Sequence, residues 1–163
     1  MEMQIRPDAI EPGKDSYTIG PVLPAERTKA PYHPSVVGRI AFFFGPLAGA
    51  LVSVVNLRRY GYPVKAKRVL SWTLLAATGW CVVLILAPEI LARVLGIAGE
   101  FASYKIYSAL QEKEFREWQT GHSELQPLNG WRAIGWGFAG LAGLFLMFFV
   151  VALGIALAFP SLA

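Results

Sequence analysis

The longest run of uncharged residues is the feature that most restricts the class of protein to which this chain can belong. Residues 133–163 contain no Asp, Glu, Lys or Arg, and most of them are apolar. About 20 such residues suffice for a helix to cross the ~30 Å hydrocarbon core of a bilayer. The whole chain has 16% charged and 55% hydrophobic residues, whereas soluble domains carry about 25% charged residues. We therefore predict an integral membrane protein.

Two further uncharged segments, residues 40–57 and 69–87, are also long enough to cross. The first contains Gly45-Pro46, where the missing backbone donor of proline predicts a kinked helix. Small residues recur every four positions in the first segment and again in the last one, and such faces favour close helix packing. The predicted packing residues are Gly45, Pro46, Gly49, Ser53, Gly140 and Gly143.

Residues 90–110 have two interpretations. They are mostly apolar, but Arg93, Glu100 and Tyr104 fall on one polar stripe of the predicted helix. The segment either crosses the membrane with this stripe turned into the bundle or lies at the interface as an amphipathic helix.

The basic residues are concentrated in one place. Residues 56–68 contain five bases and no acid, which is typical of a cytoplasmic loop and also suits anionic lipid headgroups. The five bases are Arg58, Arg59, Lys65, Lys67 and Arg68. The bases at residues 113–132 also favour the cytoplasmic side of the membrane, so residues 90–110 should cross the membrane back to that side. The predicted fold is an all-α, four-helix transmembrane bundle with spans at about 40–57, 69–87, 90–110 and 133–158 and both termini outside. Three spans plus an interfacial helix are the alternative.

Residues 1–38 precede the bundle, residues 39–163, as an extended Pro-rich tail. Six prolines disfavour helix, and no apolar run is long enough for a signal peptide. Such a segment is most easily ordered against a partner protein, although packing on the chain's own helices is the other interpretation. The predicted anchors of this docking arm are Tyr17, Ile19, Leu23 and Tyr32.

The first hairpin carries a family resemblance. The sequence Phe44-Gly45-Pro46-Leu47-Ala48-Gly49, then Asn56-Leu57-Arg58-Arg59 and Gly61, resembles that of small bacterial multi-pass membrane proteins of uncharacterised function. In that group a polar stretch with a histidine and a glycine joins the second helical pair, as residues 111–131 do here. The resemblance covers residues 40–140 and implies a four-helix membrane fold without indicating an activity. The Pro-rich tail departs from the pattern.

The sequence offers little for catalysis or cofactor binding. His33 lies in the tail and His122 in a polar loop, so neither is placed to hold a membrane-buried haem or chlorophyll. The single cysteine excludes an intrachain disulfide, and no cluster of zinc ligands is present. We predict no catalytic residue, cofactor or metal, and the segregated charge gives no reason to expect nucleic acid.

Glu100 is the one residue whose placement is costly. An acid within a membrane is by default a candidate functional residue, although a structural hydrogen bond to Thr73, Thr78 or Ser53 is the simpler explanation. The favoured function is a non-catalytic accessory or scaffold subunit of a larger bacterial inner-membrane complex, for instance an energy-transducing one. It would contact lipids and other membrane subunits through the tail and the glycine-lined faces. The alternative is a small transporter or proton-linked protein that uses Glu100.

Overall fold

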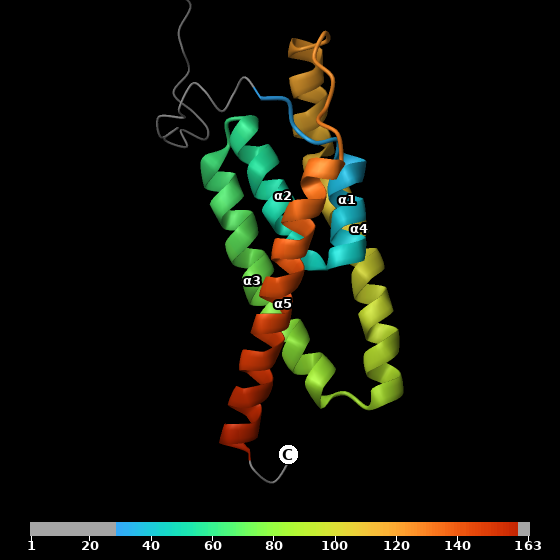
Figure 1. Cartoon of the computed structure of the whole chain (residues 1–163), viewed down its shortest axis with the longest axis vertical. Coiled ribbons are helices and arrows are strands. Elements are labelled where there is room, and N and C mark those ends of the chain that lie inside the picture. The colour runs from blue at the N-terminus through green and yellow to red at the C-terminus, as the bar shows by residue number, and fades with distance from the viewer. Residues whose placement is uncertain (1–28, 160–163) are drawn as a thin grey trace, which may run out of the picture.

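The computed structural model describes residues 29–159, which form five α-helices and no strand (Figure 1). The helices are α1 (Pro34–Phe44), α2 (Pro46–Arg59), α3 (Pro63–Leu86), α4 (Glu89–Gly121) and α5 (Trp131–Ala158). The predicted all-α architecture is confirmed, with five helices in place of four. The last positions of the predicted tail are helical, because α1 begins at Pro34. The predicted anchors Tyr17, Ile19 and Leu23 lie outside the described residues.

Gly45 turns the first apolar segment back on itself. Its φ of 84° and ψ of 173° fall in a region that is almost confined to glycine. Pro46 then starts α2, where its missing N–H leaves no intrahelical bond unmade. A Cβ on Gly49 would lie 2.5 Å from the Ala41 Cβ, so α1 and α2 pack tightly as a hairpin. Residues 40–57 are therefore not the single kinked helix that the sequence suggested.

The hairpin brings the start of α1 to the same end of the molecule as the end of α2. The Tyr32 backbone N–H donates to Asn56 Oδ1 at 2.8 Å, so the start of α1 and the end of α2 lie side by side. From that end α3 leads away, α4 returns and α5 leads away again (Figure 1). Lys29 and Phe159, the first and last described residues, therefore lie toward opposite ends of the long axis (Figure 1), whereas the four-span prediction expected both ends of the bundle on one side. Two short helices that run forward and back, α1 and α2, replace the one long helix that was predicted.

Helix α4 follows the long axis of the molecule. It contains all of residues 90–110 and runs antiparallel to α3, and its C-terminal part projects beyond the other helices (Figure 1). This segment therefore packs lengthwise beside the other helices, while its crossing of a membrane stays a prediction.

The core is centred on the α1–α2 hairpin. A Cβ on Gly140 would lie 2.6 Å from the Ala48 Cβ and closer still to its backbone, which brings α5 against α2. A Cβ on Gly38 would meet Ser108 Oγ of α4 and lie 3.0 Å from a Tyr104 ring carbon. Small residues thus allow close helix approach on both sides of the hairpin. The buried hydrophobic cluster comprises Tyr32, Val37, Ile40, Ala41, Ala48, Ala50, Val52, Tyr107 and Ala133.

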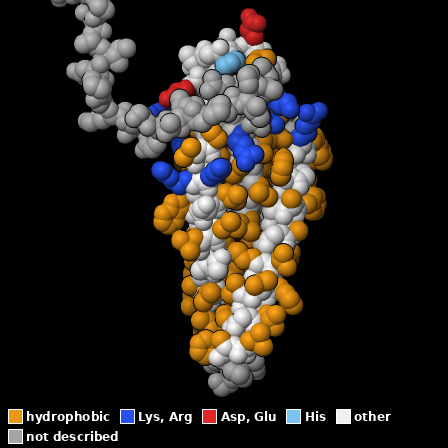
Figure 2. Space-filling model, turned by 90° about the vertical axis from the view of Figure 1, so that its left-hand side faces the viewer, with side chains coloured by type: hydrophobic (Ala, Val, Ile, Leu, Met, Phe, Trp, Pro, Cys, Tyr) orange, Lys and Arg blue, Asp and Glu red, His pale blue; other side chains and the backbone are white. Residues whose placement is uncertain are grey.

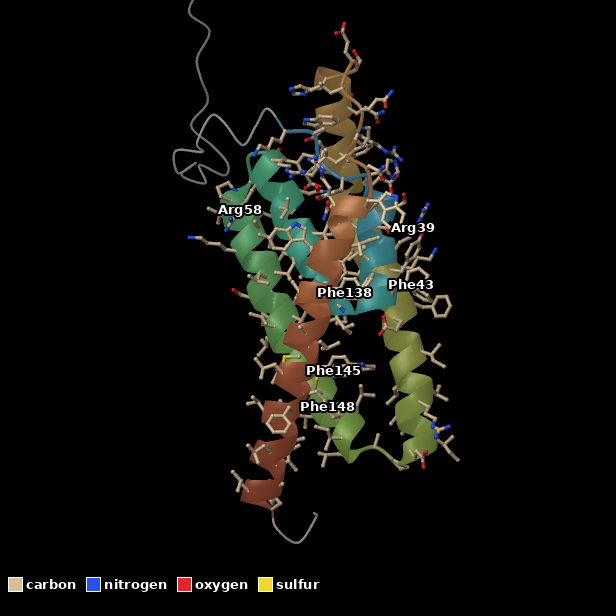
Figure 3. All side chains as sticks on the ribbon, viewed as in Figure 1. Arg39, Phe43, Arg58, Phe138, Phe145 and Phe148 are labelled. Atoms are coloured by element: carbon tan, nitrogen blue, oxygen red, sulfur yellow. The ribbon has the colours of Figure 1, made fainter. Side chains whose placement is uncertain are left out.

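The outer surface is divided along the long axis. Large apolar side chains are exposed on α3, α4 and α5, including Phe138 and Phe145 of α5 (Figure 3). On the face shown in Figure 2, they cover a long body that ends at a band of Lys and Arg side chains. Two helices, α3 and α5, are long and apolar enough to cross a membrane.

Candidate functional site: a groove between α3 and α4

Three levels of side-chain contact join α3 to α4. Lys65 forms an ion pair with Glu114 at one end. Thr73 Oγ1 and Tyr107 Oη share a hydrogen bond of 2.6 Å in the middle. At the third level Gly99 faces the Trp80 indole, which an added Cβ would approach to 3.1 Å. Each step of seven or eight residues along α3 matches a similar step back along α4, as expected for an antiparallel pair.

Between these helices lies a cavity of about 1150 Å³. This volume slightly exceeds the roughly 300–1,000 Å³ of typical small-molecule pockets. Its walls are mostly apolar and come from α3 and α4, while Pro46 of α2 and Leu144 and Phe148 of α5 contribute further lining. Because the hairpin reverses at Gly45, the space beyond its tip is lined by the three long helices. We call this cavity the α3–α4 groove.

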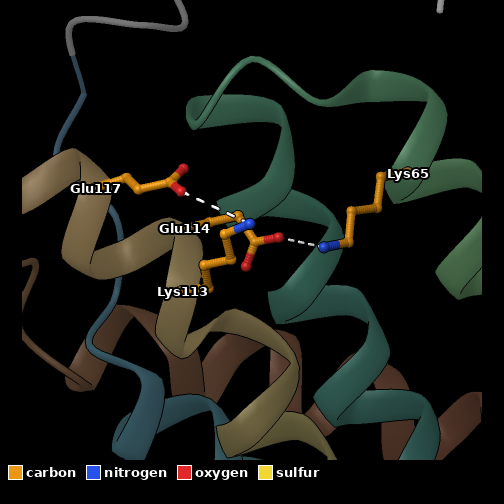
Figure 4. A network of polar contacts seen from close by, with 4 residues as sticks. All are labelled: Lys65, Lys113, Glu114 and Glu117. Carbon is orange, nitrogen blue, oxygen red and sulfur yellow. Dashed lines mark hydrogen bonds and ion pairs between the residues drawn. The ribbon is translucent and has the colours of Figure 1, made fainter. Parts of the chain in front are cut away.

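The mouth of the groove is charged (Figure 4). Lys65 and Arg68 come from α3, and Lys113, Glu114 and Glu117 come from α4. Besides the Lys65–Glu114 pair, Lys113 Nζ lies 3.9 Å from Glu117 Oε1. No ion pair of Arg68 occurs within residues 29–159.

The five bases of residues 56–68 lie in three different environments. Arg59 donates to the Ala30 carbonyl at 2.8 Å and stacks over the Tyr32 ring, with its guanidinium carbon 5.2 Å from the ring centroid. Arg58 and Lys67 are exposed and do not line the groove. Only Lys65 and Arg68 reach the groove, where Lys113 of α4 joins them. The sequence placed Lys113 on the same side as this cluster, but not in the groove, because its position there depends on the register and orientation of α4 against α3.

Glu100 lies on the groove wall, and its Oε2 is buried with no hydrogen-bond partner among the described residues. The structural hydrogen bond expected for it is absent there: Thr73 bonds to Tyr107, Thr78 donates to a backbone carbonyl, and Ser53 Oγ is itself unpartnered.

The rest of the predicted polar stripe does not join Glu100. Arg93 is exposed and pairs with Glu89 at 2.5 Å, and Tyr104 packs beside Gly38 of α1. The three residues therefore do not form one site.

The segment before α1 is held by side chains of the chain itself. Asn56 accepts from the Tyr32 N–H and donates to the Tyr32 carbonyl at 2.9 Å and to Gln111 Oε1 at 2.6 Å. The Leu128 N–H donates to the Pro31 carbonyl at 2.9 Å, which ties the same segment to the α4–α5 connection. We call residues 30–33 the strap.

The strap changes the interpretation of Tyr32. This side chain is only 2% exposed, so it packs on the chain's own helices and is not presented to a partner as predicted. The missed signal was Asn56, an amide at the end of an apolar run, whose hydrogen bonds would have to be met inside the protein.

The predicted packing glycines are used within the chain. Gly49 faces Ala41 and Tyr107, and Gly140 faces Ala48, so neither surface is open to a partner. Gly143 is at an ordinary distance, since an added Cβ would lie 3.8 Å from Leu47 Cδ1. Ser53 is fully buried.

Comparison with family models, curated proteins and solved structures finds no match to this chain. The resemblance of the first hairpin to small bacterial membrane proteins therefore stays a prediction. Within residues 29–159, no three His, Cys, Asp or Glu side chains gather as metal ligands would. The arrangement at the groove, an elongated apolar space with charges at one end, suits the binding of an amphipathic molecule.

Proposed function

We propose that the chain is an integral membrane protein that acts by binding, as a non-catalytic accessory or scaffold subunit of a larger bacterial inner-membrane assembly. The observation that carries this proposal is the division of its surface (Figure 2). Side chains such as Phe145, 67% exposed, and Ile97, 63% exposed, cover the body below the cationic band. Each Å² of such surface is about 25 cal/mol more stable out of water, which favours a bilayer as its surroundings.

In the proposed orientation α3, α4 and α5 cross the bilayer and the α1–α2 hairpin enters halfway. The basic end, with Arg58 and Lys67, faces the cytoplasm. Irregular backbone at membrane depth is tolerated where protein covers it, and the turn at Gly45 is buried. The strap is then cytoplasmic, and Phe159 is on the outer side.

This orientation has a direct test. In a background with Cys81→Ala, single cysteines at Lys29, Ser123 and Phe159 are labelled in intact cells by a membrane-impermeant maleimide. We expect only Phe159→Cys to react before the cells are opened, and the other two afterwards. Labelling of Lys29→Cys in intact cells would contradict the half-depth hairpin and restore a full first crossing.

Partner contacts are proposed for the N-terminal tail and the outer helix faces. The glycine surfaces at Gly49 and Gly140 are occupied within the chain and are not available. Residues 1–28 of the tail lie outside the described residues, but the strap fixes the point at which they join the helices.

The subunit role is tested by purification in a mild detergent with a C-terminal tag. Quantitative mass spectrometry should find one or more membrane proteins at constant stoichiometry. Deleting residues 2–28 leaves the strap in place and should release the chain from that assembly while membrane insertion is retained. Recovery of the full-length chain alone, at every detergent concentration, would refute the subunit role.

One observation favours a second candidate, a proton-linked transporter. The unpartnered, buried Oε2 of Glu100 faces an open groove, as a proton or cation carrier would require. Purified protein in vesicles with an imposed pH gradient separates the two functions. Transport requires that the wild type and Glu117→Gln dissipate the gradient and Glu100→Gln does not. The subunit proposal expects no dissipation by any of the three.

A further inference from the structure

We propose that the charged end of the α3–α4 groove is a site for one anionic glycerophospholipid, with its phosphate among Lys65, Arg68 and Lys113 and its acyl chains along the apolar walls. This inference rests on the membrane orientation proposed above and adds a ligand that the subunit role does not require.

The cations face the groove from two helices. Lys65 and Arg68 lie one turn apart on α3, and Lys113 lies opposite them on α4. Basic pockets between transmembrane helices on the cytoplasmic side are characteristic sites for anionic headgroups. Arg68, which forms no ion pair within residues 29–159, offers a fork of donors that matches phosphate oxygens.

The net charge of the groove mouth matches one monovalent anion. Three cations and two acids line the mouth, which gives 3 − 2 = +1. Glu114 is committed to Lys65 in a pair whose carboxylate side chain is only 10% exposed. The Lys113–Glu117 contact is long, at 3.9 Å, and both side chains are mostly exposed, so Lys113 can turn toward a phosphate. A phosphodiester with one negative charge would neutralise the mouth.

The walls below the mouth suit acyl chains. Trp72 and Ala76 of α3 and Ile106 and Leu110 of α4 line the groove at this depth. The buried hydrogen bond between Thr73 and Tyr107 satisfies both hydroxyl groups at this level.

The length of the groove accommodates whole acyl chains. From Arg68 to Leu84 it runs sixteen residues, roughly 24 Å along a helix, which exceeds the roughly 15 Å of one leaflet of a ~30 Å core, so acyl chains that start at the mouth have room along the walls for their full length. Glu100 lies thirteen residues below Lys113, roughly 20 Å away, and takes no part in binding the headgroup.

Native mass spectrometry of the purified full chain tests the site. Phosphatidylglycerol and phosphatidylcholine with identical acyl chains are titrated separately, and bound lipids are counted. We expect one phosphatidylglycerol to bind several-fold more tightly than phosphatidylcholine. Arg68→Gln should weaken that binding about fivefold, the effect of one headgroup-contacting cation. Lys67→Gln, a neighbouring exposed cation outside the groove, should change it less than twofold.

A second pair of variants locates the acyl chains. Ala76→Phe fills the groove wall, whereas Ala139→Phe adds the same ring to an exposed position of α5. Both positions are exposed, so neither change should unfold the bundle. Ala76→Phe should abolish the tight phosphatidylglycerol site, and Ala139→Phe should leave it intact. Equal binding of the two lipids, equal effects of Arg68→Gln and Lys67→Gln, or no effect of Ala76→Phe would each overturn the proposal. None of these results would alter the cysteine labelling that tests the orientation.

Discussion

Gly140 offers the sharpest test of the packing between α2 and α5. An added Cβ would lie 2.6 Å from the Ala48 Cβ and closer still to the Ala48 Cα and backbone nitrogen. Carbon atoms in ordinary contact are about 3.5–4.0 Å apart, so α5 would have to move by roughly 1 Å. The nearest atoms belong to the backbone of α2, so no rotamer change relieves the clash. Gly154, in the same helix, has no atom within 4 Å of such a Cβ.

The expected magnitudes follow from two opposing effects. Overpacking in a well-packed core costs about 1–3 kcal/mol. Replacing glycine by alanine within a helix contributes up to about 1 kcal/mol in the other direction. We expect Gly140→Ala to lower the free energy of unfolding by about 1–2 kcal/mol and Gly154→Ala to raise it by up to about 1 kcal/mol. The gap between the two variants is therefore about 2 kcal/mol, or roughly 4–8 °C in melting temperature.

The assay is thermal unfolding of both variants in one detergent, followed by circular dichroism. Adding Ala48→Gly to Gly140→Ala should restore only a small part of the loss, because the backbone clash remains. Equal melting temperatures for Gly140→Ala and Gly154→Ala would show that α2 and α5 do not approach as described.

Three further predictions concern the hairpin turn, the strap and the end of α2. Gly45→Ala should destabilise the fold by about 1–3 kcal/mol because of its φ of 84°, whereas Gly96→Ala should not; chemical unfolding compares them. Asn56→Ala leaves the backbone N–H and C=O of Tyr32 without their hydrogen-bond partner, which costs about 1–3 kcal/mol for each group and loosens the strap. Trypsin should therefore cleave after Lys29 faster than in the control Asn129→Ala. Burial, and then the charge of Glu114, raises the pKa of Tyr60 above its usual value of about 10, although Arg59 lowers it. The folded state thus favours the neutral phenol, and its stability should fall as the pH rises above 10. Tyr60→Phe should remove part of that fall, and identical pH profiles from pH 9 to 11 would contradict it.

The all-helical architecture was predictable because the apolar runs are long and separated by charged or Pro-rich segments. The division of residues 40–57 into two helices was not. A proline within a helix predicts a kink, and only the positive φ of Gly45 turns that kink into a reversal. Hydropathy is identical in the two cases. A run of only 18 residues, near the lower limit for a crossing, was the available hint.

The residues of the groove show a second limit of prediction from the sequence. The sequence placed five bases together, but their separation into Arg59 at the strap, Arg58 and Lys67 on the surface, and Lys65 and Arg68 at the groove depends on helix orientation. Glu100 was identifiable because a charge in an apolar helix stands out locally. The hydrogen bond between Asn56 and Gln111 and the ion pair between Lys65 and Glu114 were not, because the residues of each pair lie about 50 positions apart in the chain.

The reversal at Gly45 also determines whether the chain crosses the membrane an odd or an even number of times in the proposed orientation. A hydrophobic segment that enters and leaves by the same face adds no crossing, so three long helices make the number of crossings odd in the proposed orientation. A reporter fused before the strap and one fused after α5 would then never share a compartment. The tail would never be exported during synthesis. Whatever it binds would have to be sought among proteins with a cytoplasmic surface, and a screen of periplasmic or extracellular partners would miss it.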